Sequence, residues 1–384
     1  MSFSQTIVRP LPPGSTSTDA SLVHSPLAAI EPLSELTGRS LGQLSVTQLA
    51  AGDERRWDEF VIGSPDGSFF HLSGWKRVIE KAFGYRTFYL VARRNGVITG
   101  VMPLTHVISR LFGSRLVSNA FGMYGGPVAD DDQSRRALED EAVRLMESLR
   151  VPSLEVRSIM ANRTDWMSKA DLYVTFRKPI LPQVDANLKS IPPTVRNKVR
   201  KALKNGLNLE VDQDVDRLYS VYSESVRNLG TPVFGKEYFE ILSDVFKDIS
   251  DIVIINRSGK AVAASFNLYF RDEVMPFYAG GTALAPALAA SVFMYWEVMR
   301  RACERGCRLY DFGRSKVGTG AYTFKHNWGF EATPLAYQYK LAEGQTIPDR
   351  SPLNPKYRLL IAAWQKLPLP VSRFLGPPIA KGLG

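Results

Sequence analysis

Cysteine and histidine are scarce in this sequence, which has two cysteines and four histidines among 384 residues. Two cysteines allow at most one disulfide, so the disulfide-rich scaffolds of small secreted proteins are excluded and a reducing compartment is favoured. Cys303 and Cys307 are four apart in a predicted helix, and no histidine or further cysteine lies near enough in sequence to complete a zinc site. We interpret both as packing or surface thiols and predict no metal site.

Long apolar runs are also missing. The longest nearly apolar stretch, residues 283–296, is too short to span a bilayer and contains Pro286. Residues 1–40 are rich in Ser, Thr and Pro and lack the basic start and apolar core of a signal peptide, so they are predicted to be a disordered tail. The sequence therefore predicts a cytoplasmic protein, attached at most to the inner face of the membrane.

Acidic residues are outnumbered, with 48 Lys and Arg against 38 Asp and Glu and a formal net charge of +10. Such an excess indicates an anionic partner, which would be a phosphorylated substrate, a nucleic acid or a membrane face; a basic surface without a special partner is the alternative. The predicted helix that ends at Gly206 has five cations and no intervening acid: Arg196, Lys198, Arg200, Lys201 and Lys204. This helix is either a solvated basic face or a ridge that contacts phosphates.

The chain contains an internal repeat with an offset of 163 residues. Residues 73–84 and 236–247 have apolar side chains at helical spacing, and the offset pairs Trp75 with Tyr238 and Phe83 with Phe246. The next segments, residues 89–104 and 252–268, predict two strands joined by a tight Asn-Gly or Ser-Gly turn.

The repeat continues after a length difference. Tyr124-Gly125-Gly126 and the segment from Tyr278 to Gly280 and Gly281 are each predicted to leave a strand through paired glycines and enter a long helix. The sequence thus predicts an α/β fold of two similar halves, each a mixed sheet with flanking helices. We assign residues 41–180 to the first half, 181–345 to the second, and 346–384 to a basic amphipathic segment that packs on the protein itself or lies on an anionic membrane surface.

Residues 311–313 read Asp-Phe-Gly, which is the triplet of a protein kinase. A kinase also needs an H-R-D loop and a glycine-rich loop followed by a strand lysine. The segment RACERGCRLY before Asp311 has no H-R-D, and nothing upstream supplies the glycine-rich loop. The kinase interpretation is excluded, and the triplet is placed at the end of a strand in another fold.

Three segments resemble a known family: NLGTPVFGKEYFE (228–240), YDFGRS (310–315) and GTGAYTFKHNWGF (318–330). They resemble the FemAB-type transferases of the GNAT superfamily, and most of all the branch with a BioF2-like acetyltransferase domain that is associated with exosortase, PEP-CTERM and exopolysaccharide systems. The resemblance implies tandem GNAT-like halves, in which a glycine-bearing turn opens a helix whose free backbone N–H groups face a pyrophosphate.

The resemblance also implies an N-acyltransferase that moves an aminoacyl or acyl group onto an amine of a cell-envelope or exopolysaccharide precursor. It implies no bound cofactor, a donor that is a charged tRNA or acyl-CoA, an acceptor that is an anionic small molecule or a lipid-linked sugar precursor, and no DNA. No heptad run for a coiled-coil arm is present, which weighs against tRNA, and no Q-x-x-G-x-G-type loop follows Gly281, which weighs against ordinary CoA binding. The alternatives are an acyl-CoA-dependent GNAT enzyme acting on an amino sugar and a non-catalytic precursor-binding protein.

The predicted catalytic residues are Lys325 and Asp311. The resemblance places Phe324 and Lys325 at a Phe-Lys pair that faces the reacting ends, where the ammonium would stabilise a phosphate or the oxyanion. Asp311, at a strand end, would take a proton or hold Arg314. The predicted substrate-binding residues are Phe324, Arg314, Tyr322, Tyr278, Gly280, Gly281, Tyr124 and Trp328. The alternatives are a surface lysine, a structural Asp–Arg pair and aromatic residues that belong to the core. We expect Arg314, Lys325 and part of the basic helix to line an electropositive cleft.

Overall fold

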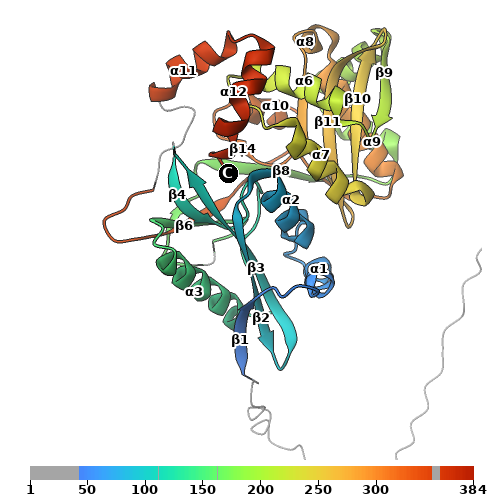
Figure 1. Cartoon of the computed structure of the whole chain (residues 1–384). Helices are drawn as coiled ribbons and strands as arrows, with labels where there is room; N and C mark the ends of the chain where they lie inside the picture. The colour runs from blue at the N-terminus through green and yellow to red at the C-terminus, as the bar shows by residue number, and fades with distance from the viewer. Residues whose placement is uncertain (1–42, 111, 162, 348–354) are drawn as a thin grey trace, which may run out of the picture. The chain divides into compact units, whose positions relative to one another are not determined.

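The computed structural model describes residues 43–110, 112–161, 163–347 and 355–384. The predicted tail of residues 1–40 lies outside these ranges. Two mixed β-sheets form the centre of the described chain (Figure 1). The first sheet has the order β1 (Leu44–Gln48), β2 (Arg86–Arg94), β3 (Val97–Ser109), β4 (Gly113–Val117), β6 (Ser153–Ser158), β16 (Ala336–Leu341) and β7 (Met167–Lys169), with β5 (Val128–Ala129) on β3.

The second sheet repeats this pattern. Its order is β9 (Leu207–Asp212), β10 (Ser250–Arg257), β11 (Lys260–Phe270), β12 (Glu273–Gly281), β13 (Leu309–Asp311), β8 (Tyr173–Pro179) and β14 (Ser315–Lys316), with β15 (Ala332–Pro334) on β8. In both sheets four antiparallel strands are followed by one parallel neighbour, β6 beside β4 and β13 beside β12. The predicted α/β fold of two GNAT-like halves is confirmed.

The helices cover both sheets. Their bounds are α1 Glu54–Gly63, η2 Phe69–His71, α2 Ser73–Phe83, α3 Asp132–Ser148, α4 Val184–Ser190, α5 Pro193–Lys204, α6 Val215–Asn228, α7 Lys236–Val245, η3 Lys247–Ile249, α8 Ala285–Leu288, α9 Ala290–Glu304, α10 Gly320–His326, α11 Pro355–Gln365 and α12 Leu369–Lys381. One apolar cluster joins the two halves through α2 and α7, a second lies between the second sheet and α5 and α9, and a third lies beneath α3.

The repeat is visible in backbone geometry. Asn95 and Gly96 have φ values of 53° and 80°, and Ser258 and Gly259, 163 residues later, have values of 49° and 77°. Positive φ at both central residues is the requirement of a type I′ hairpin turn, which explains the glycine in each copy. The register of β1 against β2 also matches that of β9 against β10, because Leu44 faces Arg94 and Leu207 faces Arg257.

The two sheets exchange strands. β8 follows β6 and β7 of the first sheet in the sequence, yet it pairs with β13 of the second sheet. In return, β16 comes from the second half and pairs with β6 of the first sheet. The predicted boundary between the two halves near residue 180 stays a prediction. Each of these two strands pairs across it. Because each half completes the sheet of the other, neither half has a complete sheet by itself.

The halves differ at the paired glycines. Tyr124 does not stand at the end of a strand, because β4 ends at Val117. The loop that follows β4 folds back, and the N–H groups of Gly125 and Gly126 donate to the Arg157 carbonyl at 3.0 and 2.9 Å. A Cβ at Gly126 would lie 2.0 Å from Ser158 Oγ, so close packing requires this glycine. The first-half loop therefore occupies the space beside β6.

In the second half the predicted glycine pair does end a strand, because Gly280 and Gly281 are the last residues of β12. The long helix is interrupted, however, and the short α8 precedes α9. The prediction that both cysteines lie in one helix is wrong: α9 ends at Glu304, and Gly306 takes a left-handed φ of 78° before Cys307. Both thiols are free and buried.

Candidate active site

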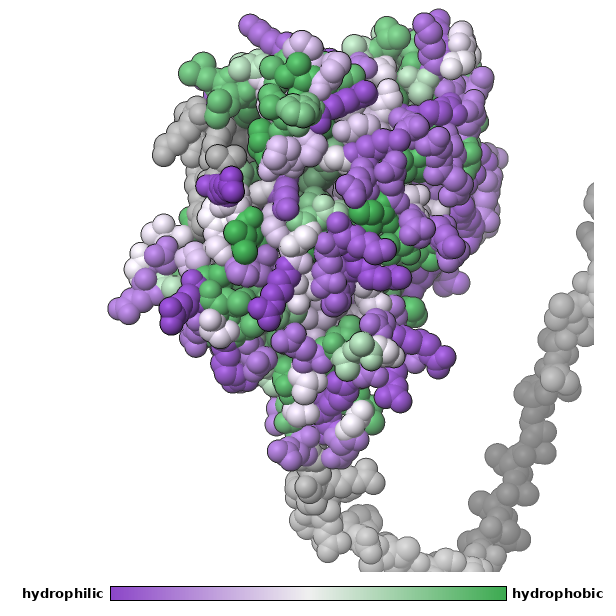
Figure 2. Space-filling model, in the orientation of Figure 1, coloured by the Kyte–Doolittle hydropathy of each residue, from purple (hydrophilic) through white to green (hydrophobic). Residues whose placement is uncertain are grey.

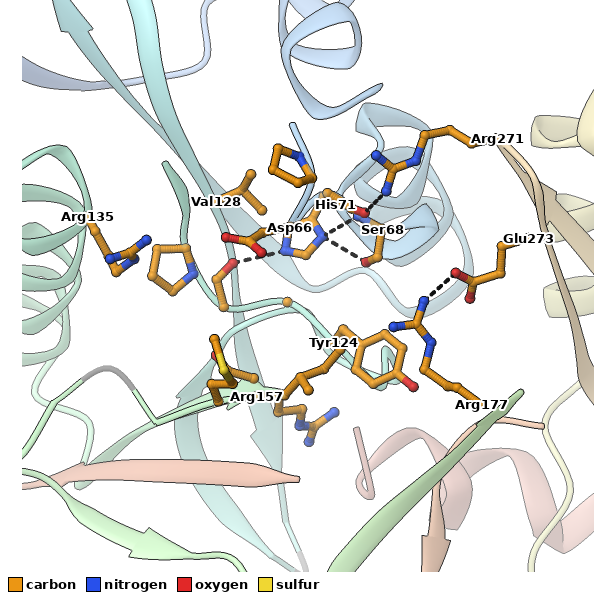
Figure 3. Close-up of a pocket in the computed structure, with 18 residues that line it drawn as sticks. Asp66, Ser68, His71, Tyr124, Val128, Arg135, Arg157, Arg177, Arg271 and Glu273 are labelled. Carbon is orange, nitrogen blue, oxygen red and sulfur yellow. Dashed lines mark hydrogen bonds and ion pairs between the residues drawn. The ribbon is translucent and has the colours of Figure 1, made fainter. Parts of the chain in front are cut away.

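A cavity of about 310 Å³ lies between the two halves (Figure 3). The first half contributes η2 and the loop that contains Tyr124 and Gly126, and the second contributes the β11–β12 turn with Arg271 and Glu273. Arg177 of the exchanged strand β8 lies at the same wall. Segments that are far apart in the sequence thus meet at one polar cavity.

Strand alternation explains why three charged side chains meet beside this cavity. Side chains of successive residues point to opposite faces of a sheet. Val274 and Tyr310 belong to the apolar cluster under α9, so their neighbours Glu273 and Asp311 take the other face. Asp311 is directly opposite Arg177 in the β13–β8 pair. The order β12–β13–β8 therefore places Glu273, Asp311 and Arg177 side by side.

Asp311 is fully buried and acts as the centre of a hydrogen-bond network. Its Oδ2 accepts from the Tyr124 hydroxyl at 2.9 Å, and its Oδ1 accepts from Thr175 Oγ1 at 3.2 Å and from the Gly313 N–H at 2.5 Å. Arg177 Nε lies 3.4 Å from Oδ2. The arginine partner of Asp311 is thus Arg177 and not the expected Arg314. Asp311 itself does not line the cavity, but Tyr124 and Arg177, which contact it, do.

Glu273 is the carboxylate at the cavity wall. Its Oε2 accepts from Arg177 Nη2 at 2.6 Å, and its side chain is 18% exposed (Figure 3). The pKa of Glu273 is raised to about 7, first by burial and then by the charge of Asp311, while Arg177 opposes both effects. A carboxyl group that titrates near neutral pH is suited to accept or donate a proton. Glu273 was not predicted from the sequence, because a single charged residue at a strand start forms no motif.

His71 also lines the cavity, but both of its ring nitrogens are occupied. Nε2 lies 2.9 Å from the Gly126 carbonyl, which only accepts, so this nitrogen carries the proton. Nδ1 accepts from the Ser68 N–H at 3.2 Å and contacts its hydroxyl at 2.8 Å. Burial lowers the pKa of His71 to about 4, so the ring is neutral at pH 7. We assign His71 to holding the loop at Gly126.

Lys325 lies in α10, and its Nζ donates to the carbonyls of Gly313 and Arg314 at 3.0 and 3.2 Å. Burial lowers the pKa of Lys325 to about 8, with Arg314 lowering it and Asp311 raising it. Lys325 is not among the residues that line the cavity between the halves. Lys325 instead binds the turn formed by Gly313 and Arg314, which directly follows Asp311. This turn therefore connects Lys325 and Asp311, the two predicted catalytic residues.

Arg314 is held by aromatic rings. Its Nη1 donates to the Tyr337 hydroxyl at 3.0 Å, and its guanidinium carbon lies 4.6 Å from the centre of the Tyr173 ring. Arg314 is also outside the cavity lining, whose cations are Arg135, Arg157, Arg177 and Arg271. The cleft expected from Arg314, Lys325 and the basic helix is therefore not this cavity.

The predicted aromatic residues separate into two groups. Tyr322, Phe324 and Trp328 pack with the apolar cluster on the α9 side of the second sheet. Tyr278 lies on the other side of that sheet, in the cluster that joins the halves, and contacts the Tyr238 hydroxyl at 2.8 Å. Only Tyr124 of the predicted aromatics lines the cavity.

The glycines Gly280 and Gly281 permit close packing. A Cβ at Gly280 would lie 2.7 Å from Ser225 Cβ, and one at Gly281 would lie 2.6 Å from Ala285 Cβ. Real Cβ atoms do not approach other atoms so closely, so α6 and α8 could not pack here with a larger residue. Packing alone explains both glycines.

The predicted basic helix is confirmed as α5, which packs through Val195, Val199 and Ala202 and leaves its lysines exposed. Asn205 Nδ2 donates to the Leu288 carbonyl at 3.2 Å. This bond brings the C-terminal end of α5 next to the beginning of α9. Within the part of the chain that the structure describes, no group of His, Cys, Asp or Glu could hold a metal ion.

Residues 193–326 match the family model of the acetyltransferase (GNAT) domain. The chain therefore contains a GNAT-type acetyltransferase domain in this segment. Its structure is similar to that of FemX, with 14% sequence identity and a TM-score of 0.61, over 83% of this chain and 100% of that one. The chain therefore shares the fold of FemX, and the GNAT assignment made from the sequence is confirmed.

Two further structures share the fold of the chain. A tandem GNAT protein from the clavulanic acid biosynthesis pathway is 11% identical with a TM-score of 0.50, over 79% of this chain and 100% of that one. The C-terminal domain of a putative lysylphosphatidylglycerol synthetase from Agrobacterium fabrum is 14% identical with a TM-score of 0.50, over 75% and 91%. No protein of curated function matches the sequence.

Proposed function

We propose that this protein is an acyltransferase of the FemAB type and transfers an aminoacyl or acyl group to an amine of a cell-envelope or exopolysaccharide precursor. The proposed setting is the cytoplasmic side of the membrane, in a system of the exosortase-associated kind. The observation that carries the proposal is the carboxylate of Glu273, which meets Arg177 at the wall of the cavity between the halves and titrates near pH 7.

The acceptor amine is assigned to this cavity. An amine that attacks a carbonyl must lose a proton, and a base whose pKa lies near the working pH does this best. Glu273 fits that role. Arg271 donates to the carbonyls of Ser64 and Gly67, at 2.9 and 2.6 Å, and these neutral partners leave its charge available to an acidic group of the precursor. Both features support an anionic amine acceptor.

The donor is assigned to the α9 side of the second half. The start of α9 adjoins the basic end of α5, where Lys201 and Lys204 are exposed, and such a combination favours phosphate groups. β12 and β13 pair only at Glu273–Leu309 and Val274–Tyr310, after which β13 leads into the turn that Lys325 binds. In this proposal residues 311–314 separate the donor side from the acceptor cavity, and the acyl carbonyl reacts next to them.

Acyl-CoA is the second candidate donor, with an amino sugar as acceptor. It is favoured by the match to an acetyltransferase domain. The two donors are distinguished by incubating the purified chain with acetyl-CoA or with charged tRNA and measuring, by mass spectrometry, transfer to amine-bearing envelope precursors. Transfer from tRNA alone supports the FemAB-type reaction, and transfer from acetyl-CoA alone supports the second candidate. Binding of a precursor without transfer from either donor would contradict both and leave a binding protein.

Asp311→Asn tests the link between the buried network and the proposed base. The charge of Asp311 raises the pKa of Glu273, so its removal should move the acidic limb of the rate–pH profile to lower pH. Asp66→Asn is the matched control, because it removes one negative charge from the exposed rim of the same cavity. A folded Asp311→Asn variant with an unchanged acidic limb would separate Asp311 from the reaction.

A further inference from the structure

α12 is apolar on the face that it turns to solvent. Ser372, Gly376 and Ala380 follow one another at helical spacing and are buried against the protein. The opposite face carries Phe374, which is 80% exposed, and Leu375, which is 41% exposed. A helix that packs through one face normally presents polar residues on the other, so a helix that is apolar on both faces has a second apolar contact.

α11 extends this surface. Leu359 is 81% exposed and Leu360 is also exposed, while Ile361 faces inward against Gly230. We call Leu359, Leu360, Phe374 and Leu375 the C-terminal apolar surface. Figure 2 shows hydrophobic residues gathered over α11 and α12. Contiguous exposed apolar residues of this kind mark a site of interaction with a protein or a membrane.

The surface is held in place by hydrogen bonds to the protein beneath it. Arg227 Nη1 donates to the Leu367 carbonyl at 3.1 Å, and Tyr85 donates to the Lys381 carbonyl at 2.7 Å. Arg373 Nε donates to Ser223 Oγ at 2.9 Å. Neither helix is therefore a free arm, and the apolar side chains are presented by a fixed platform.

The charge of the same segment is of one sign. Residues 355–384 contain five Lys or Arg and no Asp or Glu. Arg358, Lys366 and Lys381 are exposed beside the apolar residues. An exposed apolar surface accompanied by cations complements an anionic bilayer, where each basic residue near the surface adds about 1 kcal/mol of attraction. A second copy docked through the same surface would instead bring like charges together.

We propose that the C-terminal apolar surface docks the protein on an anionic lipid bilayer, with Leu359, Leu360, Phe374 and Leu375 in the interfacial layer. None of the described helices is long and apolar enough to cross a membrane. The surface would therefore lie on the bilayer. The inference rests on the proposed envelope function for its setting, because a lipid-linked acceptor is met at such a surface. The vesicle-binding measurement that tests it uses no donor or acceptor.

The test is sedimentation of the full chain with vesicles of mixed phosphatidylcholine and phosphatidylglycerol and with vesicles of phosphatidylcholine alone. We expect binding to the mixed vesicles that weakens in high salt and much weaker binding to the neutral ones. The double variant Leu359→Ser/Phe374→Ser should bind the mixed vesicles about tenfold more weakly or worse, because two large apolar side chains no longer leave water. Val97→Ser is the matched control, because Val97 is 67% exposed in the β2–β3 hairpin, away from the C-terminal apolar surface. This variant should bind the vesicles like the unchanged chain.

Arg358→Gln/Lys366→Gln should also weaken binding to the mixed vesicles while thermal stability stays unchanged. Absence of binding to mixed vesicles, equal binding to both kinds, or full binding by the double apolar variant would overturn the proposal. So would a dimer that the double variant converts to a monomer, with no vesicle binding by the unchanged chain. Acyl transfer to a water-soluble amine, measured in the same variants, separates a failure of docking from a failure of the chemistry.

Discussion

Glu273→Gln should lower the turnover number by at least about 10²-fold, which is the contribution that a positioned general base usually makes. The substitution keeps the shape of the side chain and removes its proton acceptor. The rate of the unchanged enzyme should rise with pH through about 7, because Glu273 accepts a proton only after it has ionised. In the variant this limb should vanish. The measurement is the pH dependence of kcat and kcat/KM with saturating donor.

The control for this prediction is again Asp66→Asn, which lowers the negative charge of the same cavity without touching Arg177. If Glu273 only tuned the electrostatic potential of the cavity, both variants would lose similar activity. If the rate of the Glu273→Gln variant still rises with pH through about 7, another group is the base. Stability is expected to change little or to increase, since a buried carboxyl with a raised pKa is costly to ionise in the fold.

The repeated part of the fold was predictable because its signals are local. The helical spacing of apolar residues around Trp75 recurs around Tyr238 in the second copy of the repeat. The hairpin turns at Asn95-Gly96 and Ser258-Gly259 need residues that accept positive φ. The exchange of β8 and β16 was not predictable in this way. A short strand does not encode its partner in its own sequence pattern, and both strands pair with a sheet that is built mainly by the other half.

The same exchange explains why only part of the candidate site was predicted from the sequence. Asp311 and Tyr124 stand in recognisable segments, at a strand end and before a glycine pair. Glu273 and Arg177 are single charged residues in strands, and they meet only because β8 lies next to β13. A side chain whose role depends on the order of three strands has no signature in the sequence alone. The cavity is a consequence of how the two halves interlock.

Lys325→Met should also lower turnover by about 10²-fold, which corresponds to roughly 3 kcal/mol of transition-state stabilisation. Methionine keeps the length of the side chain and removes its charge. Lys325 sits at the turn that follows Asp311, on the side assigned to the donor, where partial burial strengthens its field. A change confined to the KM of the donor would mean that the ammonium binds a donor phosphate instead.

Lys325 also holds the turn, and this role must be separated from the role of its charge. Methionine leaves the carbonyls of Gly313 and Arg314 without their donor, which should lower the free energy of unfolding by about 1–3 kcal/mol. Lys325→Arg can donate to both carbonyls and should restore stability. We expect it to restore turnover only in part, because a planar guanidinium does not replace a compact ammonium in a tight site.

The pH profile decides between the two roles. With a pKa of about 8, Lys325 is charged below that pH and loses its charge above it, so a reaction that needs the ammonium should slow on the alkaline side. Together with the limb near pH 7, this gives a narrow bell-shaped profile. Arginine does not titrate in this range, so Lys325→Arg should lose the alkaline limb and keep the acidic one. An alkaline limb that persists in Lys325→Arg, or a folded Lys325→Met variant with unchanged kinetics, would assign Lys325 to the turn alone.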